Sequence, residues 1–246
     1  VENFDLAIST RYIDENFRSP YGYFFGELSY PTNEKGIYTG INYKFNKKIN
    51  LALYSDIYSS MARTFTIPGI VSGIDLFSEF RYNFQKKSNI NLRLRYEKKT
   101  DLITNNNTER LLTESKKASL RIDFNFEIYN DLKTRFRAEY SNYSNELNIN
   151  NGYGLLSFIE IKYKLNNKFS LGSRYTIFST KDFNSVIYQY EYNMPGLIRS
   201  TPLYGEGSRI LIFSEFSPLD FLKIYTMLTS TNKNNVNTLG TGNEQI

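Results

Sequence analysis

The 246-residue sequence contains no cysteine, no histidine and no tryptophan. Without histidine, a Ser-His-Asp or Cys-His catalytic site and a histidine metal site are excluded. Without cysteine, disulfides, a thiolate nucleophile and an iron–sulfur cluster are excluded as well. Because these absences remove much hydrolytic and redox chemistry, we expect a protein that is not an enzyme and that uses no cofactor.

Long hydrophobic runs are also missing. No stretch of about 18 apolar residues occurs, so the sequence offers no transmembrane helix. No signal peptide is visible and the first residue is Val1 rather than methionine, so we expect a mature chain or a piece of a longer protein. The net charge of +5 is too mild by itself to indicate a nucleic-acid partner.

Aromatic residues and a period-two pattern dominate what is present. Tyrosine and phenylalanine make up 16% of the chain. Apolar and polar side chains alternate over residues 37–45 and again over 49–57, after the short turn Asn46-Lys47-Lys48. Successive side chains of a strand point to opposite faces, so this pattern predicts a hairpin with one apolar and one polar face. Similar strands are predicted at 74–84, 90–97, 120–128, 132–140, 155–164 and 169–177, and less regular ones at 186–192, 208–216 and 221–228.

Short and long connections alternate along the chain. Short polar turns lie near residues 47, 87, 130, 167 and 218, and longer connections at about 59–71, 99–116, 143–152, 179–185 and 194–206. A meander with tight turns at one end and long loops at the other is typical of outer-membrane barrels. We therefore predict an all-β fold: an antiparallel up-and-down transmembrane β-barrel of about 12–14 strands, forming one domain over residues 1–246.

Alternation alone does not decide which face meets water. In a soluble lipocalin-like or sandwich protein the charged face is outside, whereas in a membrane barrel it lines a wet lumen. Three features favour the membrane barrel. Tyrosine and phenylalanine near strand ends suit the membrane interface, strands of about 9–12 residues match the bilayer, and a closed barrel satisfies every backbone group without water.

The polar face of the predicted strands carries charges of both signs. We predict that these side chains point into the lumen: Asp75, Glu79, Arg81, Arg93, Arg95, Glu97, Arg121, Asp123, Glu127, Lys133, Arg135, Arg137, Glu139, Glu160 and Arg174. Arginines arranged as a ladder can select anions, but a selective pore shows one sign in excess. Mixed signs instead favour cross-strand ion pairs that fill the lumen.

Several short segments resemble a known family of large outer-membrane proteins of Gram-negative bacteria, in which helix-hairpin-helix repeats precede a C-terminal β-barrel. The matching segments are NFRSPYG at 16–22, NEKGIYTG at 33–40, YQYEYN at 188–193, YGEGSR at 204–209 and TLGTGNEQI at 238–246. The resemblance implies that the chain is the barrel half of such a competence-protein-like protein. The helix-hairpin-helix part and the final strand expected after the last segment are missing from this sequence, so the resemblance implies a fragment of a longer protein.

These observations lead to one expected function and one alternative. We expect a barrel in the bacterial outer membrane that is porin-like or serves as the membrane anchor of a larger assembly, in contact with lipid and with a periplasmic or surface protein. The alternative is the barrel part of a DNA-uptake or surface-binding protein, in which nucleic acid is bound only by a domain outside this chain.

Overall fold

The computed structural model describes residues 3–17, 25–27, 33–60, 69–85, 87–104, 109–149, 151–192, 196, 200–234, 238–239 and 244–245. Nearly all of them lie in strands. The strands are β1 (Phe4–Ile13), β2 (Glu34–Lys44), β3 (Ile49–Ser60), β4 (Val71–Gln85), β5 (Ser88–Thr104), β6 (Arg110–Tyr129), β7 (Leu132–Asn145), β8 (Gly152–Lys164), β9 (Phe169–Thr180), β10 (Ile187–Tyr190), β11 (Ser200–Leu203), β12 (Glu206–Leu219), β13 (Leu222–Lys233), β14 (Thr238–Leu239) and β15 (Glu244–Gln245).

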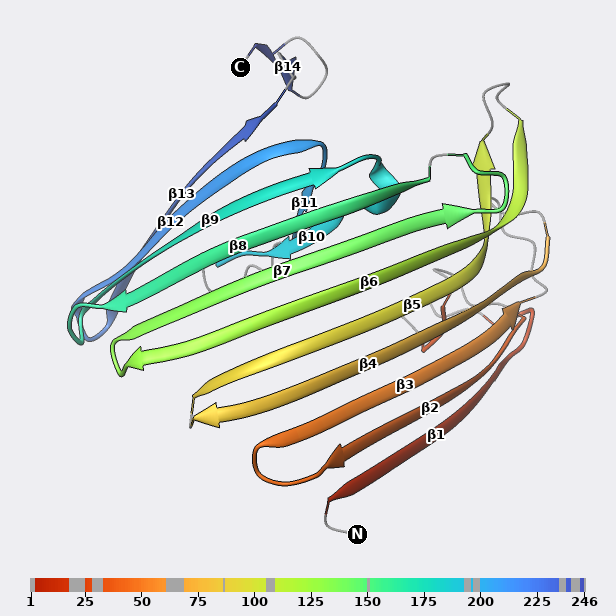
Figure 1. The fold of residues 1–246 in the computed structure, drawn as a ribbon, viewed down its shortest axis with the longest axis horizontal. Coiled ribbons are helices and arrows are strands. Elements are labelled where there is room, and N and C mark those ends of the chain that lie inside the picture. Colours follow the sequence, from red (N-terminus) through yellow and green to blue (C-terminus); the bar gives the residue numbers. More distant parts are fainter. Residues whose placement is uncertain are drawn as a thin grey trace. The chain divides into compact units, whose positions relative to one another are not determined.

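Eleven strands form one sheet in the order β1-β2-β3-β4-β5-β6-β7-β8-β9-β12-β13 (Figure 1). Sheet neighbours are also neighbours in sequence, except that β12 follows β9. The prediction of an all-β, antiparallel up-and-down fold is confirmed. The sheet holds fewer strands than expected, because β10 and β11 pair with each other in a separate two-stranded sheet, as do β14 and β15.

Asparagine side chains fix the shape of two predicted turns, β2–β3 and β8–β9. In the β2–β3 turn, Oδ1 of Asn46 accepts hydrogen bonds from the backbone N–H groups of Lys48 and Ile49, at 2.8 and 2.9 Å. Oδ1 of Asn166 makes the same two bonds in the β8–β9 turn, to Lys168 and Phe169. An asparagine side chain that replaces a backbone acceptor in this way fixes a tight turn locally. Both turns therefore follow from the sequence.

Strands β5 and β6 run further than the sequence predicted. They contain 17 and 20 residues, so most of the connection expected at 99–116 belongs to strands. In the extensions, Leu102-Ile103 and Leu111-Leu112 place apolar residues side by side among polar ones, which breaks the alternation. Because an alternation of apolar and polar residues is the signal for a strand, these extensions escape detection.

By their contacts, the residues group into two units. The first contains Val1–Asn83, Asn91–Leu120 and Asn142–Asn151, and the second contains Phe84–Ile90, Arg121–Ser141 and Gly152–Ile246. The expectation of one domain over 1–246 stays a prediction.

In the second unit, a short segment packs on strands β8 and β9. A 3-10 turn over Phe183–Ser185 leads into β10, and the β10–β11 hairpin contributes Ile187 and Leu203 to a small buried apolar cluster. The cluster is completed by Leu156 and Phe158 of β8 and Phe178 of β9. The strand predicted at 186–192 is present over Ile187–Tyr190, but its position on a face of the sheet was not predicted. Among the described residues, no helix is long and apolar enough to cross a membrane.

Candidate functional site: the charged face of the sheet

In both units the strands have one face with charged residues and one with mostly apolar residues. We call the first the charged face and the second the apolar face. On β7, Arg137, Glu139 and Ser141 are buried, while Phe136, just before them, and Tyr140, between the last two, are exposed. On β8 the order is the same, with buried Glu160 between exposed neighbours. The charged residues are therefore the enclosed ones, and the large apolar residues are the exposed ones.

In the second unit, a network of ion pairs lies on β6 and β7. Oδ1 of Asp123 accepts hydrogen bonds from Nη2 of Arg135 at 2.8 Å and from Nε of Arg137 at 2.9 Å. Beside it, Arg121 donates to both carboxylate oxygens of Glu139, at 2.7 and 2.9 Å. Asp123 is only 6% exposed. Paired contacts of this kind have the geometry that best compensates the loss of hydration of a buried carboxylate.

Three of the arginines lie over the ring of one phenylalanine of β8. The guanidinium carbons of Arg135, Arg137 and Arg174 lie 5.6, 5.3 and 4.3 Å from the centroid of the Phe158 ring. Nε of Arg174 donates to Glu160 at 2.7 Å. The ring face carries negative charge density and stabilises the guanidinium groups beside it.

The first unit repeats this organisation on β4 and β5. Arg95 donates to both oxygens of Asp75, at 3.0 and 2.8 Å, and the hydroxyl of Tyr54 donates to the same carboxylate at 2.9 Å. Arg95 also pairs with Glu97 at 3.1 Å. Glu79 binds two arginines, Arg93 and Arg81, the second at 3.1 Å.

Charged residues near the tight turns are paired more loosely. Glu127 lies 3.0 Å from Nζ of Lys87 and 4.0 Å from Nζ of Lys133, and both lysine side chains are more than half exposed. With these pairs, every residue predicted to line a lumen lies within 4.0 Å of an opposite charge. The structure thus brings the predicted residues together as pairs and small networks, not as a ladder of one sign.

The most deeply enclosed of these clusters was not predicted from the sequence. Arg11 of β1 donates from Nε to Glu34 at 2.6 Å and from Nη1 to both oxygens of Asp56, at 2.8 and 2.9 Å. Gly36 of β2 lies opposite Arg11, and a Cβ there would sit 2.5 Å from the guanidinium carbon. Residues 4–13 alternate like the other strands, and this pattern was the available signal.

The β10–β11 hairpin is a second feature that was not predicted. It lies on the charged face of β9 and β12. Gln189 is almost fully buried and its side chain accepts a hydrogen bond from Thr176 at 3.0 Å, and Nη1 of Arg174 donates to the backbone oxygen of Tyr190 at 2.7 Å. Just after β10, the carboxylate of Glu191 binds Nε and Nη2 of Arg209, at 2.6 and 2.9 Å. Polar contacts therefore fasten this segment to the charged face.

The ionisation of Glu191 reflects these contacts. Burial acts to raise the pKa of this carboxyl group, but the ion pair with Arg209 and hydrogen bonds from Thr201 and Gln189 outweigh it and hold the pKa below its ordinary value. The carboxylate form is therefore the one that anchors the segment.

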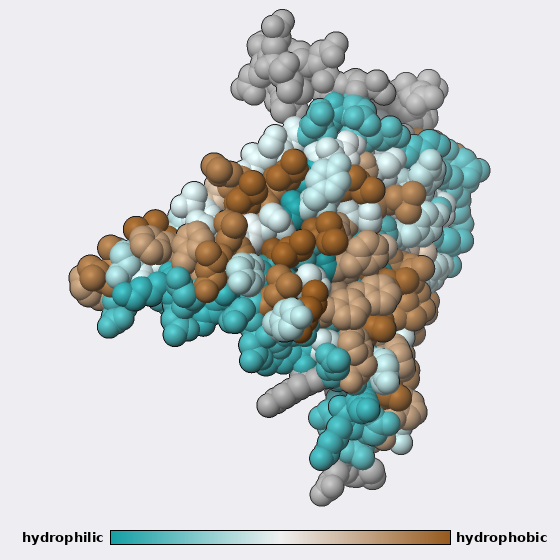
Figure 2. All heavy atoms as spheres, turned by 60° about the vertical axis from the view of Figure 1, so that its left-hand side comes forward, coloured by the Kyte–Doolittle hydropathy of each residue, from teal (hydrophilic) through white to brown (hydrophobic). Residues whose placement is uncertain are grey.

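The apolar face is exposed over long stretches. In the second unit it presents large side chains along β7, β8, β9 and β12: Phe136, Tyr140, Leu155, Ile159, Ile161, Tyr163, Leu171, Tyr175, Ile177, Ile210, Ile212 and Phe216. Figure 2 shows hydrophobic residues gathered over a broad area and hydrophilic residues bordering it. A continuous apolar area of this extent is unusual on a protein surface that faces water.

On the charged face, the acidic side chains are paired with basic ones, so the charges offset each other. The carboxylates of this face are occupied as ion-pair partners, since Asp75, Asp123 and Glu139 each accept at least two hydrogen bonds from arginines. Among the described residues, no group of three or more acidic side chains is arranged to hold a metal ion. That the chain is not an enzyme, and that DNA binding belongs to a domain outside it, remain predictions.

No protein-family model matches the chain, and no curated protein matches it. Among solved structures, the chain is similar to the crystal structure of the P. putida toluene transporter TodX, with 10% sequence identity and a TM-score of 0.38. The match covers 92% of this chain and 71% of that chain. A similarity at this level carries no argument about function. The resemblance of the short sequence segments to helix-hairpin-helix proteins also stays a prediction, and parts of those segments lie outside the described residues.

Proposed function

We propose that the chain forms an outer-membrane β-barrel whose charged face lines the interior and whose apolar face contacts lipid, and that it serves as a channel or as the membrane anchor of a larger assembly. The observation that carries this proposal is the sidedness of β7: Phe136 and Tyr140 are exposed while Arg137 and Glu139 between them are enclosed in ion pairs. In water this arrangement is unfavourable on both faces, because apolar area stays hydrated and charges lose hydration. In a bilayer, the apolar face contacts lipid hydrocarbon, so its apolar area is removed from water.

The extent of the apolar area supports the same proposal. Strands β7, β8 and β9 contain 14, 13 and 12 residues, which exceeds the roughly 9–11 residues that a tilted strand needs to cross a bilayer. On β5 and β6 the apolar face ends where Lys98 pairs with Glu114 at 2.7 Å, beside Lys116. We place the edge of the hydrocarbon region before these charges, which leaves the ends of the two longest strands in water.

Aromatic residues near the tight turns also support the proposal. Phe169 and Phe216 pack edge to face with ring centroids 6.1 Å apart, and Phe221 in the next turn is 86% exposed. Tyr163 ends the apolar face of β8 and is also exposed. Rings at strand ends form the interfacial girdles of membrane barrels.

A reconstitution experiment tests the proposal. The full chain is refolded in a nonionic detergent and in lipid vesicles, and its circular dichroism and its migration in electrophoresis with and without boiling are compared. We expect a β-rich form that needs detergent or lipid and migrates differently until boiled. A monodisperse, β-rich protein in buffer without detergent would contradict the proposal.

Planar-bilayer recording then separates the two roles. Discrete current steps would establish a channel, whereas a folded, inserted and silent protein would establish an anchor. The β10–β11 hairpin, which lies on the charged face, predicts that any conductance is smaller than that of an unobstructed barrel of the same size.

A further inference from the structure

Two adjoining hollows lie at the tight-turn end of the charged face in the second unit. The larger has a volume of about 240 Å³ and is bordered by the β6–β7 and β8–β9 turns and by β12. The smaller has a volume of about 70 Å³ and lies between β8, β12 and β13. Lys162 and Glu215 line both of them. The two hollows therefore adjoin and share a border, and we refer to them together as the depression.

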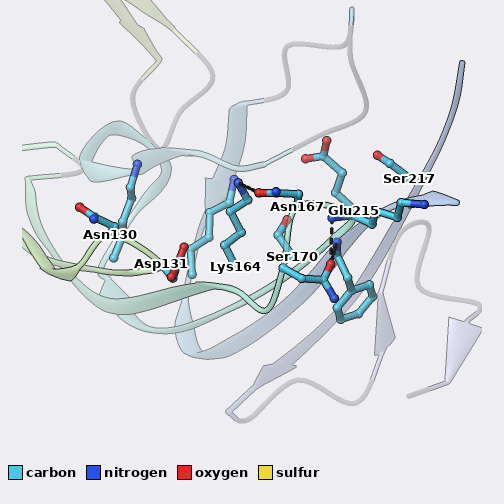
Figure 3. Close-up of a pocket in the computed structure, with 12 residues that line it drawn as sticks. Asn130, Asp131, Lys164, Asn167, Ser170, Glu215 and Ser217 are labelled. Atoms are coloured by element: carbon cyan, nitrogen blue, oxygen red, sulfur yellow. Dashed lines mark hydrogen bonds between the residues drawn. The ribbon is translucent and has the colours of Figure 1, made fainter. Parts of the chain in front are cut away.

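The larger hollow differs in charge from the rest of the charged face. Lys133, Lys162, Lys164 and Lys168 line it, against only Asp131 and Glu215. Figure 3 shows Lys164 joined to Asn167 by a hydrogen bond, with Asn130 and Asp131 on one side of the hollow and Glu215 and Ser217 on the other. Nζ of Lys168 donates to the backbone oxygen of Pro218. Within the described part of the chain, no carboxylate lies in ion-pair distance of Lys162, Lys164 or Lys168, whereas arginines elsewhere on this face bind carboxylates closely.

The smaller hollow has an aromatic wall. The rings of Tyr192 and Phe213 are stacked, with centroids 4.2 Å apart and planes at 22°. Phe213 lies across Gly172 of β9, where an added Cβ would overlap the ring. Glycine at this position is therefore what allows the ring to lie flat on the strand. Tyr225 and Met227 of β13 complete the wall.

Lys162 connects the aromatic wall with the lysine-rich hollow. Its Nζ lies 5.1 Å from the centroid of Tyr192 and 5.7 Å from that of Phe213. In the sheet, Lys162 pairs with Gly172, and the next pair on the same face toward the turn is Lys164 with Ser170. Lys162 thus stands beside a flat apolar surface and Lys164 follows it on the same strand face, and neither has a carboxylate partner among the described residues.

We propose that this depression binds a small organic anion in which a carboxylate, sulfonate or phosphate group is attached to a planar apolar group. The anionic group contacts Lys162 and Lys164, where charge-assisted hydrogen bonds replace the missing carboxylate partners. The planar group lies against Tyr192 and Phe213, where stacking and apolar burial stabilise it. The two volumes fit a ligand with a single ring. This inference goes beyond the proposed function, because binding does not require that the barrel conducts.

Titration calorimetry of the refolded full chain in a nonionic detergent tests the proposal. Phenyl phosphate is the probe, and inorganic phosphate and benzyl alcohol each supply only one of its two parts. We expect phenyl phosphate to bind at least about tenfold more tightly than either, and more weakly as salt is added. Equal binding of inorganic phosphate, equal binding of benzyl alcohol, or no binding of phenyl phosphate would each overturn the proposal.

Substitutions locate the site. Lys162→Met with Lys164→Met is expected to weaken phenyl phosphate binding at least about tenfold, which is the size of one lost charge-assisted contact. Lys47→Met with Lys48→Met, in the similar asparagine turn of β2–β3, is the matched control and is expected to change affinity less than about twofold. Equal losses in both variants, or a loss in neither, would overturn the assignment.

The aromatic wall is tested separately. Gly172→Ala displaces the Phe213 ring and is expected to weaken binding of phenyl phosphate but not of inorganic phosphate. Phe213→Leu serves the same purpose if Gly172→Ala does not refold, as judged by circular dichroism and by the shift in migration on boiling. Circular dichroism and the shift in migration on boiling test whether the barrel is folded, independently of ligand binding. A correctly folded chain that binds no phenyl phosphate would therefore overturn this inference but not the proposed function.

Discussion

Nε of Arg11 donates to Oε1 of Glu34 over 2.6 Å, and the side chain of Glu34 is fully enclosed. Nη1 of the same arginine binds Asp56, which is 4% exposed. One cation therefore faces two enclosed carboxylates. An ion-pair cluster of this kind is expected to add little net stability to the folded chain. Removing one member is expected to destabilise the chain strongly, because it leaves an enclosed charge without its partner.

The first prediction concerns removal of that cation. Arg11→Met takes the guanidinium away from Glu34 and Asp56 and is expected to lower the free energy of unfolding by about 3–5 kcal/mol. Urea unfolding in lipid vesicles, followed by tyrosine fluorescence, measures the change. Arg81→Met is the control: the Arg81 side chain is 47% exposed and Glu79 keeps Arg93, so the loss should stay below about 1 kcal/mol. Equal losses in the two variants would contradict the prediction that the burial of the ion pair makes its removal costly.

The second prediction concerns a close approach across β3 and β4. A Cβ at Gly73 would lie 2.6 Å from the ring and hydroxyl of Tyr58. Gly73→Ala is therefore expected to destabilise the folded chain by about 1–3 kcal/mol through overpacking. Adding Tyr58→Leu should recover part of the loss because the ring is removed. Ser72→Ala on the neighbouring, exposed position gives the baseline in the same unfolding assay, and a loss there as large as at Gly73 would argue against the contact.

The third prediction tests sidedness. Ile159 lies midway along the apolar face of β8, whereas Tyr153 lies near its end. In a membrane, Ile159→Arg is expected to cost about 2–4 kcal/mol and Tyr153→Arg about 0–1 kcal/mol, because the penalty depends on depth. Unfolding of both variants from vesicles gives the two values. If the apolar face met water, both substitutions would be nearly neutral, and such a result would refute the bilayer assignment.

The fourth prediction concerns pH. The pKa of Glu191 is below its ordinary value of 4.5, so the contact with Arg209 stabilises the attached segment fully at pH values above 4.5 and is lost as the pH falls through the lowered pKa. A spin label at Tyr188→Cys is unique in this cysteine-free chain. Its mobility is expected to rise on acidification.

Glu191→Gln in the same labelled background provides the control for the pH effect. Without an ionisable group at this position, mobility should be raised at neutral pH and should change little with acid. A label that responds to acid equally in both proteins would assign the effect to another group.

Strand positions and turns were largely predictable from this sequence, because each rests on local information. The alternation at 37–45 and the asparagine of the 46–48 turn gave the first complete hairpin without any knowledge of distant residues. The division of each strand into an apolar and a charged side followed from the same alternation. Where the alternation is broken, as beyond Lys98 with adjacent Leu102 and Ile103, the signal is lost and the strand was ended too early.

Ion-pair partners and the β10–β11 hairpin were beyond local reasoning. That Arg95 binds Asp75 depends on how β5 is shifted along β4, and a one-residue shift would move every side chain to the other face. Residues 186–192 alternate like any short strand, and nothing within them tells that they lie on the sheet instead of joining its edge. The cluster around Arg11 required two long-range pairings, β1 with β2 and β2 with β3.

The connection between β9 and β12 sets the order in which this sheet assembles. Every other pair of neighbouring strands is consecutive in sequence, and except between Ile13 and Glu34 the connections are short, so most of those contacts form with little loop-closure entropy. Between Thr180 and Glu206 the chain instead contains the complete β10–β11 hairpin before β12 pairs with β9. Arg209 of β12 binds Glu191, which follows β10. We therefore expect the β10–β11 hairpin to pack on β8 and β9 first and β12 to pair with β9 afterwards. This would make the pairing of β12 with β9 the slowest step of assembly.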